Sequence, residues 1–160
     1  MRQVFLDTET TGLSAEQGDR IVEIGCIEME NRRLTGRTLH HYLNPERSSH
    51  PDAVRVHGLT DEFLADKPLF ADRVEEFLAF IGEDQLVIHN AQFDIGFLNA
   101  ELERVGRTKL ANSYVDTVSM ARRKFPAAVG RHCPRRLAAC VSRCSPPRPS
   151  SAALRRTKMC

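Results

Sequence analysis

The acidic residues and the apolar periodicity of this chain both stop well before its C-terminus. The last acid is Asp116, and no regular apolar spacing continues beyond Pro126. Residues 1–126 carry 15 basic and 21 acidic side chains, a net charge of −6, whereas residues 127–160 carry 8 basic and no acidic ones, a net charge of +8. Because a packed core needs a periodic apolar face, we expect one domain over 1–126 and an irregular or disordered tail over 127–160.

Within the first 126 residues, extended segments come first and helical ones alternate with them later. The segments with an extended pattern span 3–7, 21–29, 38–43 and 85–89, with a turn at 31–36. The segments with helical spacing or helix boundary signals span 51–56, 68–81, 91–105 and 116–125. The first three strands should form an antiparallel meander. This order predicts an α/β fold, in which flanking helices pack on a mixed central sheet.

Two acids follow the first expected strand. In the stretch LDTETTGL, Asp7 and Glu9 stand two positions apart, so their side chains point to the same face of an extended chain, about 7 Å apart at the backbone. Two acids at a buried strand end are costly unless a cation joins them. Mg²⁺ takes carboxylate oxygens as ligands. A solvated strand end would be the simpler explanation of an isolated Asp-x-Glu.

A third acid lies at a second strand end. In VIHNAQFD, a buried strand runs directly into a helix, and Asp94 falls in the first turn of that helix. Taken alone, an acid in this place is explained by the helix dipole. Asp94 thus places a third carboxylate at another strand end, and taken together with Asp7 and Glu9 it makes a functional site the better explanation.

The chain resembles the DnaQ-like family of proofreading 3′–5′ exonucleases, in particular the epsilon subunits of bacterial DNA polymerase III. The matching stretches are FLDTETTGL, DRIVEIGCIEMENRRLTG, HHYLNPERSSHPDAVRVHGLTDEFLADKPLFADRVEEFLAFI, LVIHNAQFDIGFLNAEL and VDTVSMARRKFP. They cover residues 2–126 almost without interruption. The resemblance implies an RNase H-like fold and hydrolysis of mispaired 3′-terminal nucleotides to nucleoside 5′-monophosphates, assisted by two divalent cations, Mg²⁺ or Mn²⁺.

The resemblance also implies roles for individual residues. The catalytic and metal-binding acids would be Asp7, Glu9 and Asp94. The residues near the bound nucleotide would be Asp7, Glu9, Thr10, Thr11, Leu13, Asp52 and His57, with Leu13 wedged against a base. For His57, a helix-end histidine bonded to the backbone is an equally good explanation. His89 is expected to support its strand end.

The implied partners are a single-stranded or frayed DNA 3′ end and, within the replicase, the polymerase III catalytic subunit and the small core subunit. No apolar run approaches the ~20 residues of a membrane helix, so no membrane partner is expected. The N-terminus lacks the apolar core of a secretory signal, so we expect a cytoplasmic protein. The alternatives are a related exonuclease that acts on RNA or in repair, and a remnant that binds a polymerase without catalysis.

The third motif of the family is missing. It consists of a Leu-Asp-Ala-Leu helix and a later His-Gly-Ala-Leu-Leu-Asp-Ala segment, which supplies the general-base His and the last Asp. Here no acid follows Asp116 and no histidine follows His132. The resemblance therefore implies that this chain, as it stands, is impaired or inactive.

Residues 131–144, RHCPRRLAACVSRC, occupy the place of that motif and hold three of the five cysteines and four arginines. A zinc site would need better paired cysteines, and a basic arm would bind phosphates without specificity. We favour a shifted reading frame. Residues 134–137 can be encoded by CCT CGA CGC CTT, and the same bases read one position later encode Leu-Asp-Ala-Leu.

Overall fold

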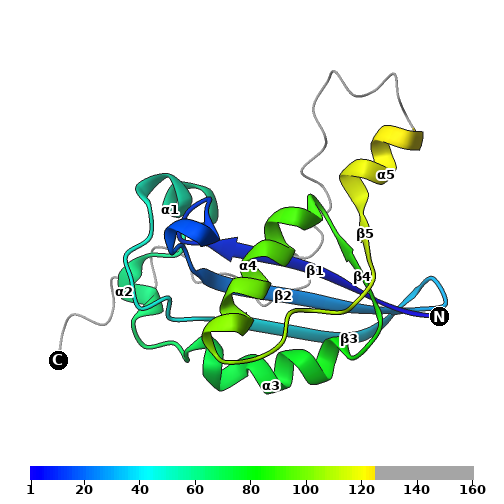
Figure 1. The fold of residues 1–160 in the computed structure, drawn as a ribbon, viewed down its shortest axis with the longest axis horizontal. Coiled ribbons are helices and arrows are strands. Elements are labelled where there is room, and N and C mark those ends of the chain that lie inside the picture. The colour runs from blue at the N-terminus through cyan, green and yellow to red at the C-terminus, as the bar shows by residue number, and fades with distance from the viewer. Residues whose placement is uncertain (125–160) are drawn as a thin grey trace.

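A five-stranded sheet in the order β3-β2-β1-β4-β5 forms the centre of the molecule (Figure 1). The computed structural model describes residues 1–124, and the expectations for the tail lie outside that part. The strands are β1 (Arg2–Thr10), β2 (Ile21–Glu30), β3 (Arg33–Tyr42), β4 (Gln85–Ile88) and β5 (Tyr114–Asp116). β1, β2 and β3 are antiparallel, and β4 and β5 run parallel to β1. The predicted mixed sheet with an antiparallel meander is confirmed.

The hairpin between β2 and β3 is tighter than the sequence predicted. We expected a turn over 31–36, but β3 already begins at Arg33. Asn31 and Arg32 both have a positive φ, 49° and 65°. Two consecutive residues with positive φ form the type of two-residue turn that matches the twist of the flanking strands. The prediction of a longer turn was therefore wrong, because two residues suffice.

The helical elements agree with the sequence in their order and differ at their ends. They are η1 (Ala15–Gln17, a 3₁₀ helix), α1 (Pro51–His57), α2 (Asp61–Leu64), α3 (Phe70–Ile81), α4 (Ala91–Arg104) and α5 (Thr117–Lys124). The expected helix 116–125 starts one residue later, because Asp116 ends β5. The sequence did not predict η1, α2 or β5. The sequence does contain a signal for the start of α2, because threonine is a typical N-cap residue and Thr60 directly precedes this helix. In the structure the Thr60 side chain accepts a hydrogen bond from Phe63 N, as an N-cap does.

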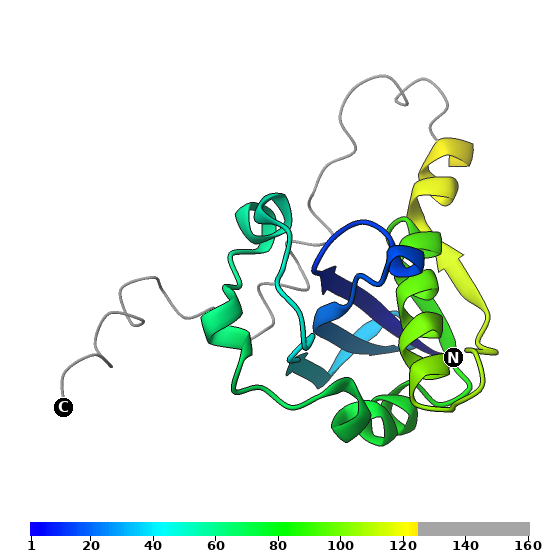
Figure 2. The ribbon, with the colours of Figure 1, turned by 60° about the vertical axis from the view of Figure 1, so that its left-hand side comes forward.

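The core lies on one face of the sheet, beneath α3 and α4 (Figures 1 and 2). Strand residues that face it alternate along each strand: Val4 and Leu6 in β1, Ile24 and Cys26 in β2, and Leu86 and Ile88 in β4. The helices contribute Phe70, Val74, Phe77, Ile81, Phe97, Leu98 and Leu102. Since β1 and β4 are adjacent and parallel, both end at the same edge of the sheet. Within residues 1–124, no helix is long and apolar enough to span a membrane.

Candidate active site

The end of β1 presents two acids on one face. Burial alternates along the strand, with Thr8 and Thr10 buried and Asp7 and Glu9 partly exposed. Asp7 lies opposite Gly25 of β2, and the register shifts between Glu9 and Thr10. The two acids therefore share a face, as their spacing predicted.

Asp94 reaches the same strand from α4. Only 3% of it is exposed, and its Oδ1 accepts hydrogen bonds from Thr8 N at 3.0 Å and from Thr8 Oγ1 at 2.7 Å. Burial, reinforced by the negative charge of Asp7, raises the pKa of Asp94 to about 7, although the hydrogen bonds from Thr8 act in the opposite direction. The structure thus joins Asp94 to the β1 segment that carries Asp7 and Glu9.

Asp19 fixes the loop that follows β1. Its carboxylate accepts hydrogen bonds from Thr11 Oγ1 at 3.0 Å and from Ser14 N at 3.1 Å. Thr11 Oγ1 also accepts one from Arg20 N, and Thr11 is completely buried. A Cβ at Gly12 would overlap the Asp19 carboxylate. No role was predicted for Asp19, because the residues that it holds precede it by five to eight positions in an irregular loop.

A cavity of about 560 Å³ opens beside this loop. It is lined by Thr8, Glu9, Thr10, Gly12, Leu13, Ser14, Gln17, Asp19, His50, Asp52, Ala53, Val56, His57 and Phe93. Of the residues expected near a nucleotide, five line it: Glu9, Thr10, Leu13, Asp52 and His57. Leu13, one of these five, is 87% exposed. Thr11 is instead buried in the loop.

His57 lies at the end of α1 and is 3% exposed. Its Nδ1 accepts a hydrogen bond from Leu59 N at 3.0 Å. The neutral ring therefore carries its proton on Nε2. This backbone contact is the one that the helix-end explanation predicted, and the ring also lines the cavity, so both explanations retain support.

The donor chemistry of the three predicted acids suits Mg²⁺ or Mn²⁺, because all are carboxylates. Their arrangement is less complete. Among residues 1–124, no group of three or more His, Cys, Asp or Glu side chains is placed so that it could hold a metal ion. The structure brings Asp94 to β1, but it does not gather the three acids around a common point.

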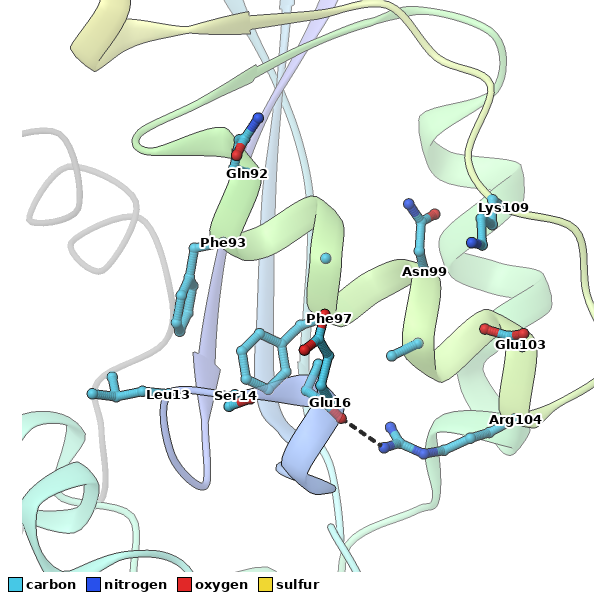
Figure 3. Close-up of a pocket in the computed structure, with 13 residues that line it drawn as sticks. Leu13, Ser14, Glu16, Gln92, Phe93, Phe97, Asn99, Glu103, Arg104 and Lys109 are labelled. Carbon is cyan, nitrogen blue, oxygen red and sulfur yellow. Dashed lines mark hydrogen bonds between the residues drawn. The ribbon is translucent and has the colours of Figure 1, made fainter.

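A second cavity, of about 720 Å³, lies between η1 and α4 (Figure 3). Phe93 and Phe97 line it, with ring centroids 4.9 Å apart. Arg104 also lines it and donates a hydrogen bond to Ala15 O at 3.5 Å. It shares Leu13, Ser14 and Phe93 with the smaller cavity but contains none of the three predicted acids. The smaller cavity is therefore the candidate active site.

A protein-family model described as Exonuclease (RNase_T) matches residues 4–144. The chain belongs to this exonuclease family. Exonucleases of this kind typically use divalent metals. The match begins in β1, includes Asp7, Glu9 and Asp94, and extends 18 residues beyond the expected domain boundary at residue 126.

Curated relatives of this exonuclease-family chain are DNA polymerase III epsilon subunits. The protein from Rickettsia felis is 52% identical over 132 residues, which are 80% of this chain and 58% of the relative. The protein from Escherichia coli is 47% identical over 133 residues, which are 78% of this chain and 55% of the relative. The chain thus spans less than two thirds of the length of these relatives.

Solved structures show the same fold. Exonuclease X in complex with 5′ overhanging duplex DNA is 30% identical, with a TM-score of 0.61 over 78% of this chain and 65% of that one. An E. coli ExoI–ssDNA complex has a TM-score of 0.70 at 20% identity, over 89% of this chain and 35% of that one. The predicted exonuclease fold is confirmed.

Proposed function

We propose that residues 1–126 form the exonuclease domain of a 3′–5′ proofreading subunit of a bacterial DNA polymerase III, which removes mispaired 3′-terminal nucleotides. The observation that carries the proposal is the pair of hydrogen bonds from Thr8 to Asp94, because they join the acid of the second motif to the strand that bears the first. About 50% identity to curated epsilon subunits supports this function over that of a general nuclease.

Asp7, Glu9 and Asp94 would supply carboxylate ligands for divalent cations, Mg²⁺ or Mn²⁺, and would have to move closer together than they lie in the structure to share them. Such cations, when bound, would stabilise charge on the scissile phosphate and lower the pKa of a bound water. The chain's own residues do the positioning. Thr8 holds Asp94 against β1. Asp19 fixes the loop whose Leu13 would wedge against a base.

The substrate would be a single-stranded or frayed DNA 3′ end. The terminal nucleotide would occupy the smaller cavity, near Thr10, Asp52 and His57. Residues 1–126 carry a net charge of −6, so they would hold a polyanion weakly and depend on partners for sustained contact. The partners implied are the polymerase III catalytic subunit and the small core subunit, acting in the cytoplasm.

We further propose that this chain is catalytically impaired. No acid follows Asp116 and no histidine follows His132, so the general base and the last acid of the third motif are missing from the sequence. Loss of a general base alone typically lowers a rate by about 10²–10⁴-fold. The tail over 127–160 would then be the product of a shifted reading frame, which the nucleotide sequence around codon 133, read in three frames, tests directly.

The enzymatic test compares the chain with a chimera in which the C-terminal part of the R. felis relative replaces residues 127–160. Both are incubated with Mn²⁺ and single-stranded DNA that is labelled in its 3′-terminal nucleotide, and the released labelled mononucleotide is measured. We expect the chimera to be at least about 10²-fold faster than the chain, and Asp7→Asn with Glu9→Gln to abolish its activity.

The possible outcomes separate the two proposals. A folded chimera that is inactive, or that keeps its activity without Asp7 and Glu9, contradicts the proposed function. Rapid release by the chain itself contradicts only the proposed impairment. Preference of the chimera for RNA of the same sequence would favour an RNA exonuclease instead.

A further inference from the structure

The connection between β4 and α4 is short and conformationally unusual. β4 ends at Ile88 and α4 begins at Ala91, so His89 and Asn90 form the whole connection. Asn90 has φ 64° and ψ 53°, in the left-handed region. Residues other than glycine adopt this region infrequently, and they stay there only where their surroundings hold them.

Asp116, at the end of the neighbouring strand, holds this connection. Its Oδ1 accepts a hydrogen bond from Asn90 N at 3.2 Å. The same oxygen accepts one from Val118 N at 2.9 Å, and Oδ2 accepts one from Ser119 Oγ at 2.8 Å. A single carboxylate therefore starts α5 and fixes the residue that precedes α4.

The residue after Asp116 makes a parallel contact. Thr117 Oγ1 lies 3.0 Å from His89 Nδ1, within hydrogen-bond distance, and Thr117 is buried. Both residues of the β4–α4 connection are thus bonded to the β5–α5 junction. The register agrees, because Ile88 and Asp116 are partners in the parallel pairing of β4 and β5.

Asp94 lies in the first turn of α4, four residues beyond Asn90. Thr8 contacts its carboxylate from β1, whereas its backbone position depends on where α4 begins. The start of α4 is set by Asn90 and, through it, by Asp116. A change in the direction of this first turn would move Asp94 relative to Asp7 and Glu9.

We propose that Asp116 is a positioning residue, which sets the place of Asp94 through the backbone of Asn90. One part of this inference rests on the proposed function: the expectation that a displaced Asp94 binds a divalent cation less tightly. Its structural part, the coupling of Asp116 to the Thr8–Asp94 contact, stands without it.

Three variants of the full chain separate positioning from the stability of α5. Asp116→Ser retains an N-cap for α5, but its shorter side chain does not reach Asn90. Asp116→Asn retains an oxygen that accepts from both Asn90 N and Val118 N. Ser119→Ala removes only the hydroxyl bonded to Oδ2 and is the matched control.

The first readout is hydrogen exchange of the Thr8 amide, whose acceptor is Asp94. We expect at least about ten-fold faster exchange in Asp116→Ser than in the unchanged chain, and little change in the other two variants. The second readout is Mn²⁺ affinity by calorimetry. Loss of a group that orients a metal ligand typically weakens affinity about 10–100-fold, which we expect for Asp116→Ser alone.

The two readouts test different claims: Mn²⁺ binding tests the metal site, and exchange of the Thr8 amide tests the positioning by Asp116. If the unchanged chain binds no Mn²⁺, the metal site of the proposed function fails, while Thr8 exchange still tests the positioning. Unchanged Thr8 exchange in folded Asp116→Ser overturns the inference. An equal effect in Ser119→Ala also overturns it, because the cause would then be the stability of α5.

Discussion

Thr8 donates two hydrogen bonds to one carboxylate oxygen of Asp94, from its backbone N–H at 3.0 Å and from its hydroxyl at 2.7 Å. The two residues are 86 positions apart, and both are buried. Hydrogen bonds favour the charged form of this carboxylate, whereas burial and Asp7 oppose it. The protonation of Asp94 therefore depends strongly on Thr8.

Replacing Thr8 with valine should expose this dependence. Valine keeps the shape and the backbone N–H but removes the hydroxyl donor. Because hydrogen bonds to charged groups contribute about 1.5–3 kcal/mol, we expect the free energy of unfolding at pH 8 to fall by roughly that amount, and the pKa of Asp94 to rise further. Urea denaturation in a chelating buffer measures the first, with Thr8→Ser as the control that restores the donor. If Thr8→Val and the unchanged chain are equally stable at pH 8, the hydroxyl of Thr8 does not stabilise the charged carboxylate of Asp94.

Asp94 should also make stability depend on pH. Its pKa is about 7 in the folded chain, above the ordinary 3.8, so the folded state retains a proton that the unfolded state has released between these values. The stabilisation from Asp94 is therefore complete below about pH 4 and is lost as the pH rises through 7. Since one pKa unit corresponds to about 1.4 kcal/mol, the loss is on the order of 4 kcal/mol.

Asp94→Asn should remove this dependence. In metal-free buffer we expect the variant to match the unchanged chain near pH 4 and to exceed it in free energy of unfolding at pH 8. The measurement is the difference between the two unfolding curves across this range, which cancels the other titrating groups. Glu83→Gln, at an exposed acid, is the control and should leave the difference near zero. A difference between Asp94→Asn and the unchanged chain that does not vary with pH would refute the raised pKa.

The positions of the acids could be predicted from the sequence, but the contacts that hold them could not. Asp7 and Glu9 share a face because side chains in a strand repeat every two residues, and Asp94 was placed by the strand–helix boundary before it. Thr8 and Asp116 carried no such signal. Their bonds to Asp94 and Asn90 join residues that are distant in sequence, and they exist only once β1, β4 and β5 are adjacent.

Short elements such as β5 could not be predicted from the local sequence either. β5 has three residues and no apolar period of its own, so it is defined by pairing with β4 rather than by its sequence. The long amphipathic helix α3 was predicted to within two residues at its start, because five of its twelve residues form a buried stripe.

Gly12 should tolerate no side chain, in contrast to Gly96. A Cβ at Gly12 meets the Asp19 carboxylate, whereas one at Gly96, within α4, has nothing within 4 Å. We expect Gly12→Ala to lower the free energy of unfolding by about 1–3 kcal/mol through crowding, and Gly96→Ala to raise it by about 0.5–1 kcal/mol as a helix substitution. Thermal denaturation of both variants checks this. Equal effects of the two changes would show that Asp19 does not pack against the loop.

The buried pair of Arg20 and Glu101 should couple the loop after β1 to α4. Glu101 is 1% exposed, and its two oxygens accept from Arg20 Nε at 2.7 Å and Nη2 at 3.0 Å. Arg20 also contacts Thr11 through the backbone, since Thr11 N donates to Arg20 O at 2.8 Å. Glu101 also accepts from Arg104 Nη1 at 3.2 Å, a contact that remains when Arg20 is removed. We therefore expect Glu101→Leu to cost about 3–5 kcal/mol and Arg20→Leu to cost less.

A double-mutant cycle measures the coupling of this pair. The double variant leaves neither of the two charges, so we expect it to be more stable than the sum of the single effects predicts, with a coupling energy of about 1–3 kcal/mol. The exposed pair Arg73–Glu76, at 3.5 Å, is the matched control, and its coupling should stay within about 0.2–1 kcal/mol. If both cycles give the same small value, the Arg20–Glu101 pair does not anchor the active-site loop. If only the buried pair couples strongly, α4 supports the loop that carries Leu13 as well as the acid that faces β1.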